Sequence, residues 1–162
     1  MKKWILISVI IILLLLIIAI LILYTNDMQM NECLEVRVPK LTKRESVQLK
    51  DSDLFNDEEL IKIYLSPNQS KSIIRKIEKN DNWKKEKLDE RLKERLEFHT
   101  REEIFYQIPK IENYYWIFTN RSNGVNDKHS VDVLLEDGMY YAISLGILDI
   151  DNNILYYYEY DR

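Results

Sequence analysis

The stretch Met139-Tyr-Tyr-Ala-Ile-Ser-Leu-Gly-Ile-Leu-Asp-Ile-Asp-Asn-Asn-Ile-Leu-Tyr-Tyr-Tyr-Glu-Tyr160 decides the fold of this chain. Two runs rich in apolar and aromatic residues, 139–150 and 154–160, flank Asp151-Asn152-Asn153. Aromatic and β-branched residues favour strands, whereas Asp and Asn favour tight turns because they bond their own backbone and tolerate left-handed conformations. The stretch therefore predicts a β-hairpin close to the end of the chain.

Further strands are predicted upstream of this hairpin. Apolar and charged residues alternate over 33–38 and 60–65, which is the period of a half-buried strand, and Pro39 stops the first of them. The aromatic and β-branched run 113–119 predicts a buried strand. The segments 46–49 and 131–135 are shorter strand candidates.

Two helices are predicted between these groups of strands. Ser66-Pro67 is a strong helix start, and the helix it begins is expected to end near Lys79. A second helix over 83–98 carries the apolar positions Leu88, Leu92 and Leu96 at intervals of four. This narrow stripe is typical of a peripheral helix, with a seam to a partner as the alternative. The predicted fold class is α+β, an antiparallel sheet with two helices packed on one face.

The N-terminal region carries a long apolar run, Trp4–Leu23, directly after Lys2 and Lys3. A helix of about 20 residues spans the roughly 30 Å hydrocarbon core of a bilayer, so the run predicts a transmembrane helix with lipid as its partner through residues 4–23. A cleaved signal peptide is the competing interpretation, but the run is long for one and no small-residue cleavage signal follows it. The lysines favour a cytoplasmic N-terminus.

The expected organisation has three parts. Residues 1–24 form a transmembrane anchor, 25–32 a tether, and 33–162 an extracytoplasmic α+β domain on the outer face of the cell membrane. The formal charge of −4 argues against a nucleic-acid partner. Cys33 is the only cysteine, so no internal disulfide can form. It is expected to be a small buried residue, with a disulfide-linked homodimer as the alternative.

No catalytic, cofactor or metal site is predicted. Asp149, Asp151 and Asn153 match the opening of a calcium loop, but Ile154 replaces the required glycine and Tyr160 the bidentate glutamate. Other groupings lack the surroundings that their chemistry needs. These are the lone histidines His99 and His129, the triad residue types Asp127, His129 and Ser130, and the carboxylate pairs Glu136 with Asp137 and Glu159 with Asp161.

The remaining candidate is an aromatic surface on the last predicted strand. Tyr156, Tyr158 and Tyr160 project from one face of that strand because side chains alternate along it. Tyrosine offers a large contact area with a polar tip, so these rings form a candidate surface for an envelope protein, a peptide or a glycan. The alternative is that helices cover the rings.

Several apolar and aromatic segments carry a family resemblance. They are Ile73–Trp83, Ile108-Pro109, Tyr114-Tyr115-Trp116, Leu148-Asp149 and Leu155–Asp161. Together they resemble small, uncharacterised membrane-anchored proteins of low-GC Gram-positive bacteria. The resemblance covers the second half of the chain, and it implies neither an activity nor a functional residue.

The function predicted from the sequence is that of a membrane-anchored binding or accessory module without enzymatic activity. An immunity or exclusion protein that protects against a toxin or phage is one alternative. A cell-envelope hydrolase that uses carboxylates of the polar loop 121–130 and of the hairpin is another.

Overall fold

The structure, a computed structural model, describes residues 2–48, 57–100, 104, 107–122, 127–131 and 142–161. Within these ranges the side chains of 2–8, 19–26, 48, 57, 95, 97–100 and 161 are not described. The chain divides into two compact units, Met1–Glu32 and Cys33–Arg162.

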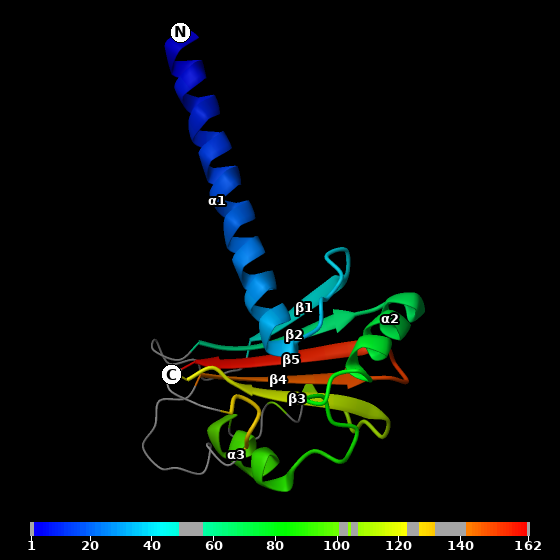
Figure 1. Ribbon diagram of the computed structural model, residues 1–162. Helices are drawn as coiled ribbons and strands as arrows, with labels where there is room; N and C mark the ends of the chain where they lie inside the picture. Colours follow the sequence, from blue (N-terminus) through cyan, green and yellow to red (C-terminus); the bar gives the residue numbers. More distant parts are fainter. Residues whose placement is uncertain are drawn as a thin grey trace. The chain divides into compact units, whose positions relative to one another are not determined.

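The second unit is built on a five-stranded antiparallel sheet (Figure 1). Its strand order is β1-β2-β5-β4-β3, so the last strand of the chain is the central one. The strands are β1 (Lys43–Gln48), β2 (Asp57–Tyr64), β3 (Tyr114–Asn120), β4 (Ala142–Asp149) and β5 (Ile154–Asp161). The antiparallel sheet and the α+β class agree with the prediction, as does the hairpin of β4 and β5.

The turn between β4 and β5 is closed by hydrogen bonds among its own residues. One carboxylate oxygen of Asp149 accepts hydrogen bonds from the backbone N–H groups of Asp151 and Asn152, and the other accepts from the Asn152 side chain. Asn153 adopts a left-handed conformation, with φ of 56°, which asparagine tolerates better than most residues. The turn therefore depends on its own residue types and needs no distant partner.

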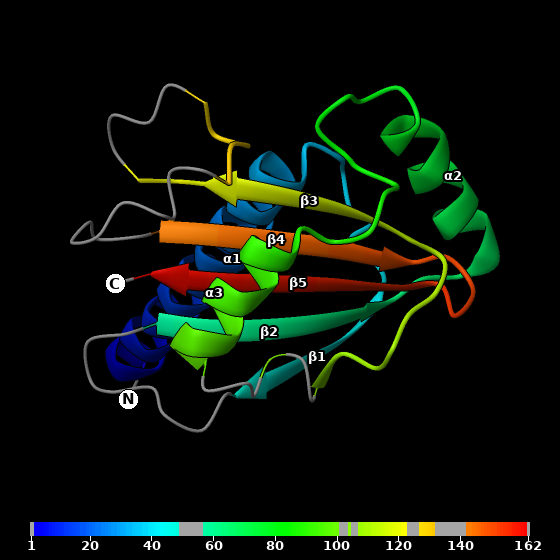
Figure 2. The same cartoon turned by 90° about the horizontal axis from the view of Figure 1, so that it is seen from below.

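Two helices accompany the sheet in different places. Helix α3 (Glu90–Thr100) lies across one face, whereas α2 (Pro67–Ile77) lies beside the strand ends, where β4 ends and β5 begins (Figure 2). The prediction of two helices on one face is therefore wrong. Helix α3 also begins later than the predicted start at Trp83, because the segment before it runs along the sheet edge and Lys84 pairs with Trp116 of β3.

The predicted strand over 33–38 is also wrong. Helix α1 (Lys2–Leu34) continues through the segment expected to be a tether and ends where Glu35 takes a left-handed conformation, with φ of 52°. Val36 and Val38 are nevertheless buried and Arg37 is exposed, as the alternating pattern required. Period-two burial arises here without strand pairing, because an extended segment alternates its side chains wherever it lies.

The expected membrane anchor requires a correction. Within the apolar run of α1, the side chains that the structure describes are those of 9–18, each roughly half exposed, from 47% at Val9 to 61% at Leu15. Among the described residues, no helix has both the length and the apolar character that crossing a membrane requires. This finding contradicts the predicted single-pass span over 4–23 and the outer-face location inferred from it.

Helix α2 has the start that Ser66-Pro67 predicts. The Ser66 hydroxyl accepts a hydrogen bond from the Gln69 backbone N–H, and the Gln69 side chain accepts one from the Ser66 N–H. This reciprocal arrangement is a capping box, which satisfies two backbone donors at the helix start. On the inner side of the helix, Ile73 and Ile77 are buried.

Removal of this cap should cost a measurable part of the stability. We expect Ser66→Ala to lower the free energy of unfolding by about 1 kcal/mol, because the first turn loses an acceptor. Ser72→Ala is the matched control, since Ser72 is exposed within the same helix and alanine is the better helix former there. Chemical denaturation of the three proteins measures both effects, and equal stabilities for the two variants would contradict the role of the cap.

Candidate functional site

The three tyrosines predicted to form a binding surface lie inside the protein. Tyr156, Tyr158 and Tyr160 are 3%, 1% and 4% exposed and belong to the core cluster that also contains Leu92 and Leu96 of α3. Burial raises the pKa of Tyr158, and the charge of the Glu58 carboxylate, which accepts a 2.7 Å hydrogen bond from the Tyr158 hydroxyl, raises it further. The rings that a binding surface would need are thus covered, as the alternative interpretation held.

Cys33 is buried as well. Its carbonyl oxygen accepts a hydrogen bond of 2.8 Å from the Thr119 hydroxyl, and its thiol lies near the hydroxyl of Tyr157. The structure thus agrees with a small buried residue, although at a helix end and not in a strand. A disulfide between two copies would need this sulfur to reach the surface, and the homodimer stays a prediction.

The acidic turn at Asp149 uses its carboxylates internally. Asp149 is buried and accepts the bonds that close the hairpin, while Asp151 accepts a hydrogen bond from Asn113 at 3.1 Å. Within the described ranges, no group of three or more histidine, cysteine, aspartate or glutamate side chains could hold a metal ion. These residues are turn formers in this structure.

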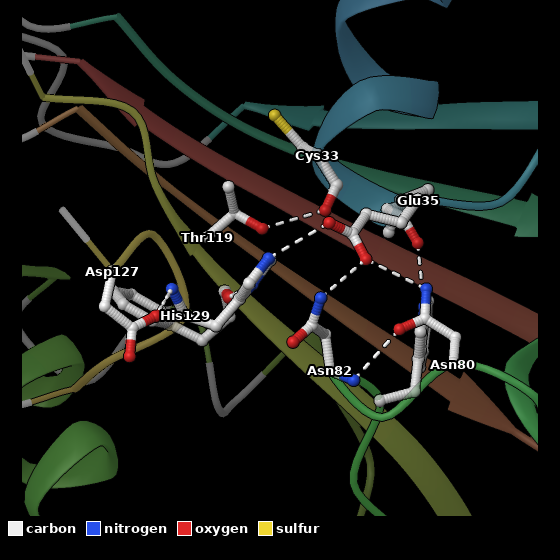
Figure 3. A network of polar contacts seen from close by, with 10 residues as sticks. Cys33, Glu35, Asn80, Asn82, Thr119, Asp127 and His129 are labelled. Carbon is white, nitrogen blue, oxygen red and sulfur yellow. Dashed lines mark hydrogen bonds and ion pairs between the residues drawn. The ribbon is translucent and has the colours of Figure 1, made fainter. Parts of the chain in front are cut away.

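A polar network centred on Glu35 joins segments that are distant in the sequence (Figure 3). One Glu35 oxygen, Oε2, accepts hydrogen bonds from the side-chain amides of Asn80 and Asn82, both at 2.9 Å. The other, Oε1, lies 3.1 Å from Nε2 of His129. The segment after α1, the turn after α2 and the segment 127–131 therefore meet at one carboxylate.

Each partner of Glu35 is itself held in place. Asn80 accepts a hydrogen bond from the Asn82 backbone N–H at 2.9 Å, which shapes the turn after α2. The other ring nitrogen of His129, Nδ1, lies 2.7 Å from the Phe118 carbonyl oxygen of β3. The Asp127 carboxylate accepts from the His129 backbone N–H at 3.0 Å. Contacts outside the carboxylate therefore restrain Asn80, Asn82 and His129 in their positions around Glu35.

The electrostatics keep Glu35 ionised. Partial burial acts to raise the pKa of Glu35, but hydrogen bonds from Asn82 and Asn80 and the charge of His129 outweigh it, so that the pKa lies below its usual value. A carboxylate that accepts several hydrogen bonds is stabilised in its charged form. The network thus contains an anion at neutral pH, and His129 faces it.

The network also closes an edge of the sheet. Strand β3 is an edge strand, and edges with free N–H and C=O groups invite pairing with other chains. Lys84 exchanges both backbone hydrogen bonds with Trp116, and Lys128 accepts from the Asn120 N–H at 2.6 Å. Between these two contacts along β3, Nδ1 of His129 lies 2.7 Å from the Phe118 carbonyl oxygen. The segments 83–84 and 127–131 therefore cover this edge.

Among the described residues, Asp127 and His129 do not adopt the arrangement of a hydrolase triad. The His129 ring contacts Glu35 and Phe118, whereas Asp127 contacts only the His129 backbone among the bonds that the structure describes for that carboxylate. A hydrolase triad requires the acid to orient the ring. Glu136 and Asp137 lie outside the described residues, as does the side chain of Asp161.

A second polar cluster lies on the sheet face that carries Cys33. The Tyr157 hydroxyl donates to Glu159 at 2.9 Å and lies 3.2 Å from the Ser144 hydroxyl. Arg121 forms a 2.8 Å ion pair with the second oxygen of Glu159. Burial, and after it the nearby Cys33 and Glu159, raise the pKa of Tyr157, so this hydroxyl stays protonated. The cluster binds β4 and β5 to the residue that follows β3.

Sequence reasoning missed both networks. Glu35 lies in the alternating stretch 33–38, which predicts a strand, and Asn80 and Asn82 lie between the two predicted helices. The available signal was weak: two asparagines that flank Asp81 after a helix favour a shaped turn, but nothing local points to Glu35 as their partner. No family model, curated protein or solved structure matches the chain. The resemblance noted above stays a prediction.

Proposed function

We propose that this chain is a binding or accessory module that associates with an apolar partner surface through the exposed part of α1. The observation that carries this proposal is the run 9–18, ten consecutive apolar side chains with between 47% and 61% exposure. Successive residues of a helix are about 100° apart, so such a run is apolar around its whole circumference. Contiguous exposed apolar surface marks an interaction site in most proteins.

The remainder of the chain supports a scaffold role for the second unit. Titratable groups of the Glu35 network, the Tyr157 cluster and the hairpin turn are engaged in contacts within the fold. A binding module needs a stable body and an exposed contact surface, and it needs no reactive group. The proposal is therefore for a binding role, and it assigns no reaction to the chain.

The proposal is tested by the association state of the full chain in aqueous buffer. Apolar surface contributes about 25 cal/mol per Å² on burial, so we expect the unmodified protein to associate and the double variant Leu13→Lys, Leu15→Lys to dissociate or remain monomeric. Sedimentation velocity at several protein concentrations measures this, and binding of a hydrophobic dye provides a second readout.

The control uses the same substitution at an isolated position. Leu41 is 95% exposed in the second unit, and single exposed leucines are ordinary on protein surfaces. Leu41→Lys is therefore expected to leave both the association state and dye binding unchanged. A full chain that stays monomeric and binds no dye, or a Leu41→Lys variant that behaves as the double variant does, would overturn the proposal.

A further inference from the structure

The ring of His129 lies between two groups that accept hydrogen bonds. The Phe118 carbonyl oxygen is 2.7 Å from Nδ1, and the Glu35 carboxylate oxygen is 3.1 Å from Nε2. A carbonyl oxygen has no proton to give, so Nδ1 carries a hydrogen and donates it. An ionised carboxylate likewise only accepts, so Nε2 must carry a hydrogen too. Both nitrogens are donors only in the positively charged imidazolium.

The alternative, in which a neutral Glu35 donates its own proton to Nε2, conflicts with the rest of the network. The second oxygen of Glu35 accepts two amide hydrogen bonds, from Asn80 and Asn82, which favours the ionised carboxylate. The lowered pKa of Glu35 has the same cause. The arrangement of donors and acceptors is therefore complete with a charged ring and a charged carboxylate.

From this geometry we propose that Glu35 and His129 form a pH-dependent clasp, which holds segment 127–131 and the residues after α1 against the edge of β3 while the ring is protonated. The charged groups that face the ring are Glu35, from the segment after α1, and Asp127, whose carboxylate caps the His129 backbone N–H. Asn80 and Asn82, from the turn after α2, are neutral. From β3 the ring meets only the Phe118 carbonyl among the described contacts.

The direction of the pH dependence follows from the two charges. Loss of a ring proton leaves Nε2 with a lone pair that faces the Glu35 carboxylate at 3.1 Å, so an attraction becomes a repulsion. As the pH falls through the lowered pKa of Glu35, the carboxylate is neutralised and the ion pair is lost. The clasp is therefore closed while the ring and the carboxylate are both charged, and it opens when either group loses its charge.

The opened state has a defined structural consequence. The Asn120 N–H, which donates to the Lys128 carbonyl at the end of β3, loses its partner when segment 127–131 moves away. The Trp116 N–H donates to Lys84 on the same edge strand, which belongs to a different segment. Exchange of these two amides with deuterium therefore separates opening of the clasp from a general loosening of the sheet.

The test measures amide exchange and ring protonation by NMR in the full chain. Corrected for intrinsic exchange, protection of the Asn120 amide should fall roughly threefold to tenfold between about pH 5.5 and about pH 8.5, because a partly exposed charged hydrogen bond is lost. Protection of the Trp116 amide should change little over that range. Ring ¹⁵N spectra at the acidic end should show both nitrogens of His129 protonated, and His99→Gln identifies the signals, since the chain has two histidines.

Glu35→Gln is the matched variant, because its amide has the shape of the carboxylate and can donate to a neutral ring. We expect this variant to lose the pH dependence at Asn120. A ring of His129 that carries a single proton at the acidic end overturns the proposal, and this result needs no variant. The proposal is equally overturned if the Asn120 amide has the same pH dependence in the unmodified protein and in Glu35→Gln.

Discussion

Gly146→Val is expected to lower the free energy of unfolding by roughly 3 kcal/mol, because a side chain at this position has no room. A Cβ built on Gly146 overlaps Cδ2 of Leu34 and lies 3.1 Å from Cγ2 of Ile117 and 3.4 Å from the Trp83 ring. All three of these neighbours are buried. Valine is otherwise favourable in a strand, so the expected loss comes from packing alone. Denaturant unfolding of both proteins measures it.

A double-mutant cycle with Leu34 provides the control for this prediction. Leu34→Ala alone should cost roughly 2–5 kcal/mol because it leaves a cavity. In the double variant, the β-branched side chain at 146 can use the space that the leucine leaves, so the combined cost should be clearly less than the sum. Additive costs would show that Leu34 does not occupy the space above Gly146, and an unchanged stability of Gly146→Val would contradict the packing altogether.

Leu92→Ala is expected to destabilise the second unit by roughly 2–5 kcal/mol. Leu92 is 0% exposed and packs in one core cluster with Leu96 and the tyrosines of β5. Loss of its side chain leaves a cavity between α3 and the sheet, since the rigid rings and strands around it can collapse only in part. Thermal or denaturant unfolding, followed by circular dichroism, measures the change.

The same helix offers the control for this prediction. Glu94 is exposed on α3, and its replacement by alanine should alter the stability by no more than about 0.5 kcal/mol. If the leucine stripe were a seam to a partner, Leu92→Ala would weaken association and leave the stability of the unit unchanged. That outcome would refute the role of α3 as a cover of the sheet.

Local patterns predicted those elements whose formation depends on neighbours in the chain. The capping residues Ser66 and Gln69 and the turn residues Asp149 and Asn153 make their hydrogen bonds within three residues, or adopt their backbone conformation unaided. The strand near 113–119 was found because its residues are aromatic and β-branched, and both of its faces are buried as such a run predicts. In each case the residues that predict the element are the same residues that form it.

Patterns failed where burial has more than one structural cause. The alternation over 33–38 was read as a strand, but those residues end a helix and continue as an extended segment. The tyrosines of β5 alternate as predicted, yet only the position of α3 decides that the face with Tyr156 and Tyr158 is covered. The apolar run at the N-terminus was read as a membrane span, which the described side chains of α1 do not support.

The amino-acid sequence alone determined the closing hairpin and the capped helix, because each depends on contacts over a few residues. The sheet as a whole needs the tertiary structure, since β2 pairs with β5 from a distant part of the sequence. Only the tertiary structure decided that Glu35 meets His129, Asn80 and Asn82, which are between 45 and 94 positions away along the chain. Contacts of this kind depend on how helices and strands pack, and no periodic pattern in the sequence predicts them. The physical reason is that local propensities act over a helical turn or a strand pair, whereas a polar network forms wherever packing brings donors and acceptors within about 3 Å.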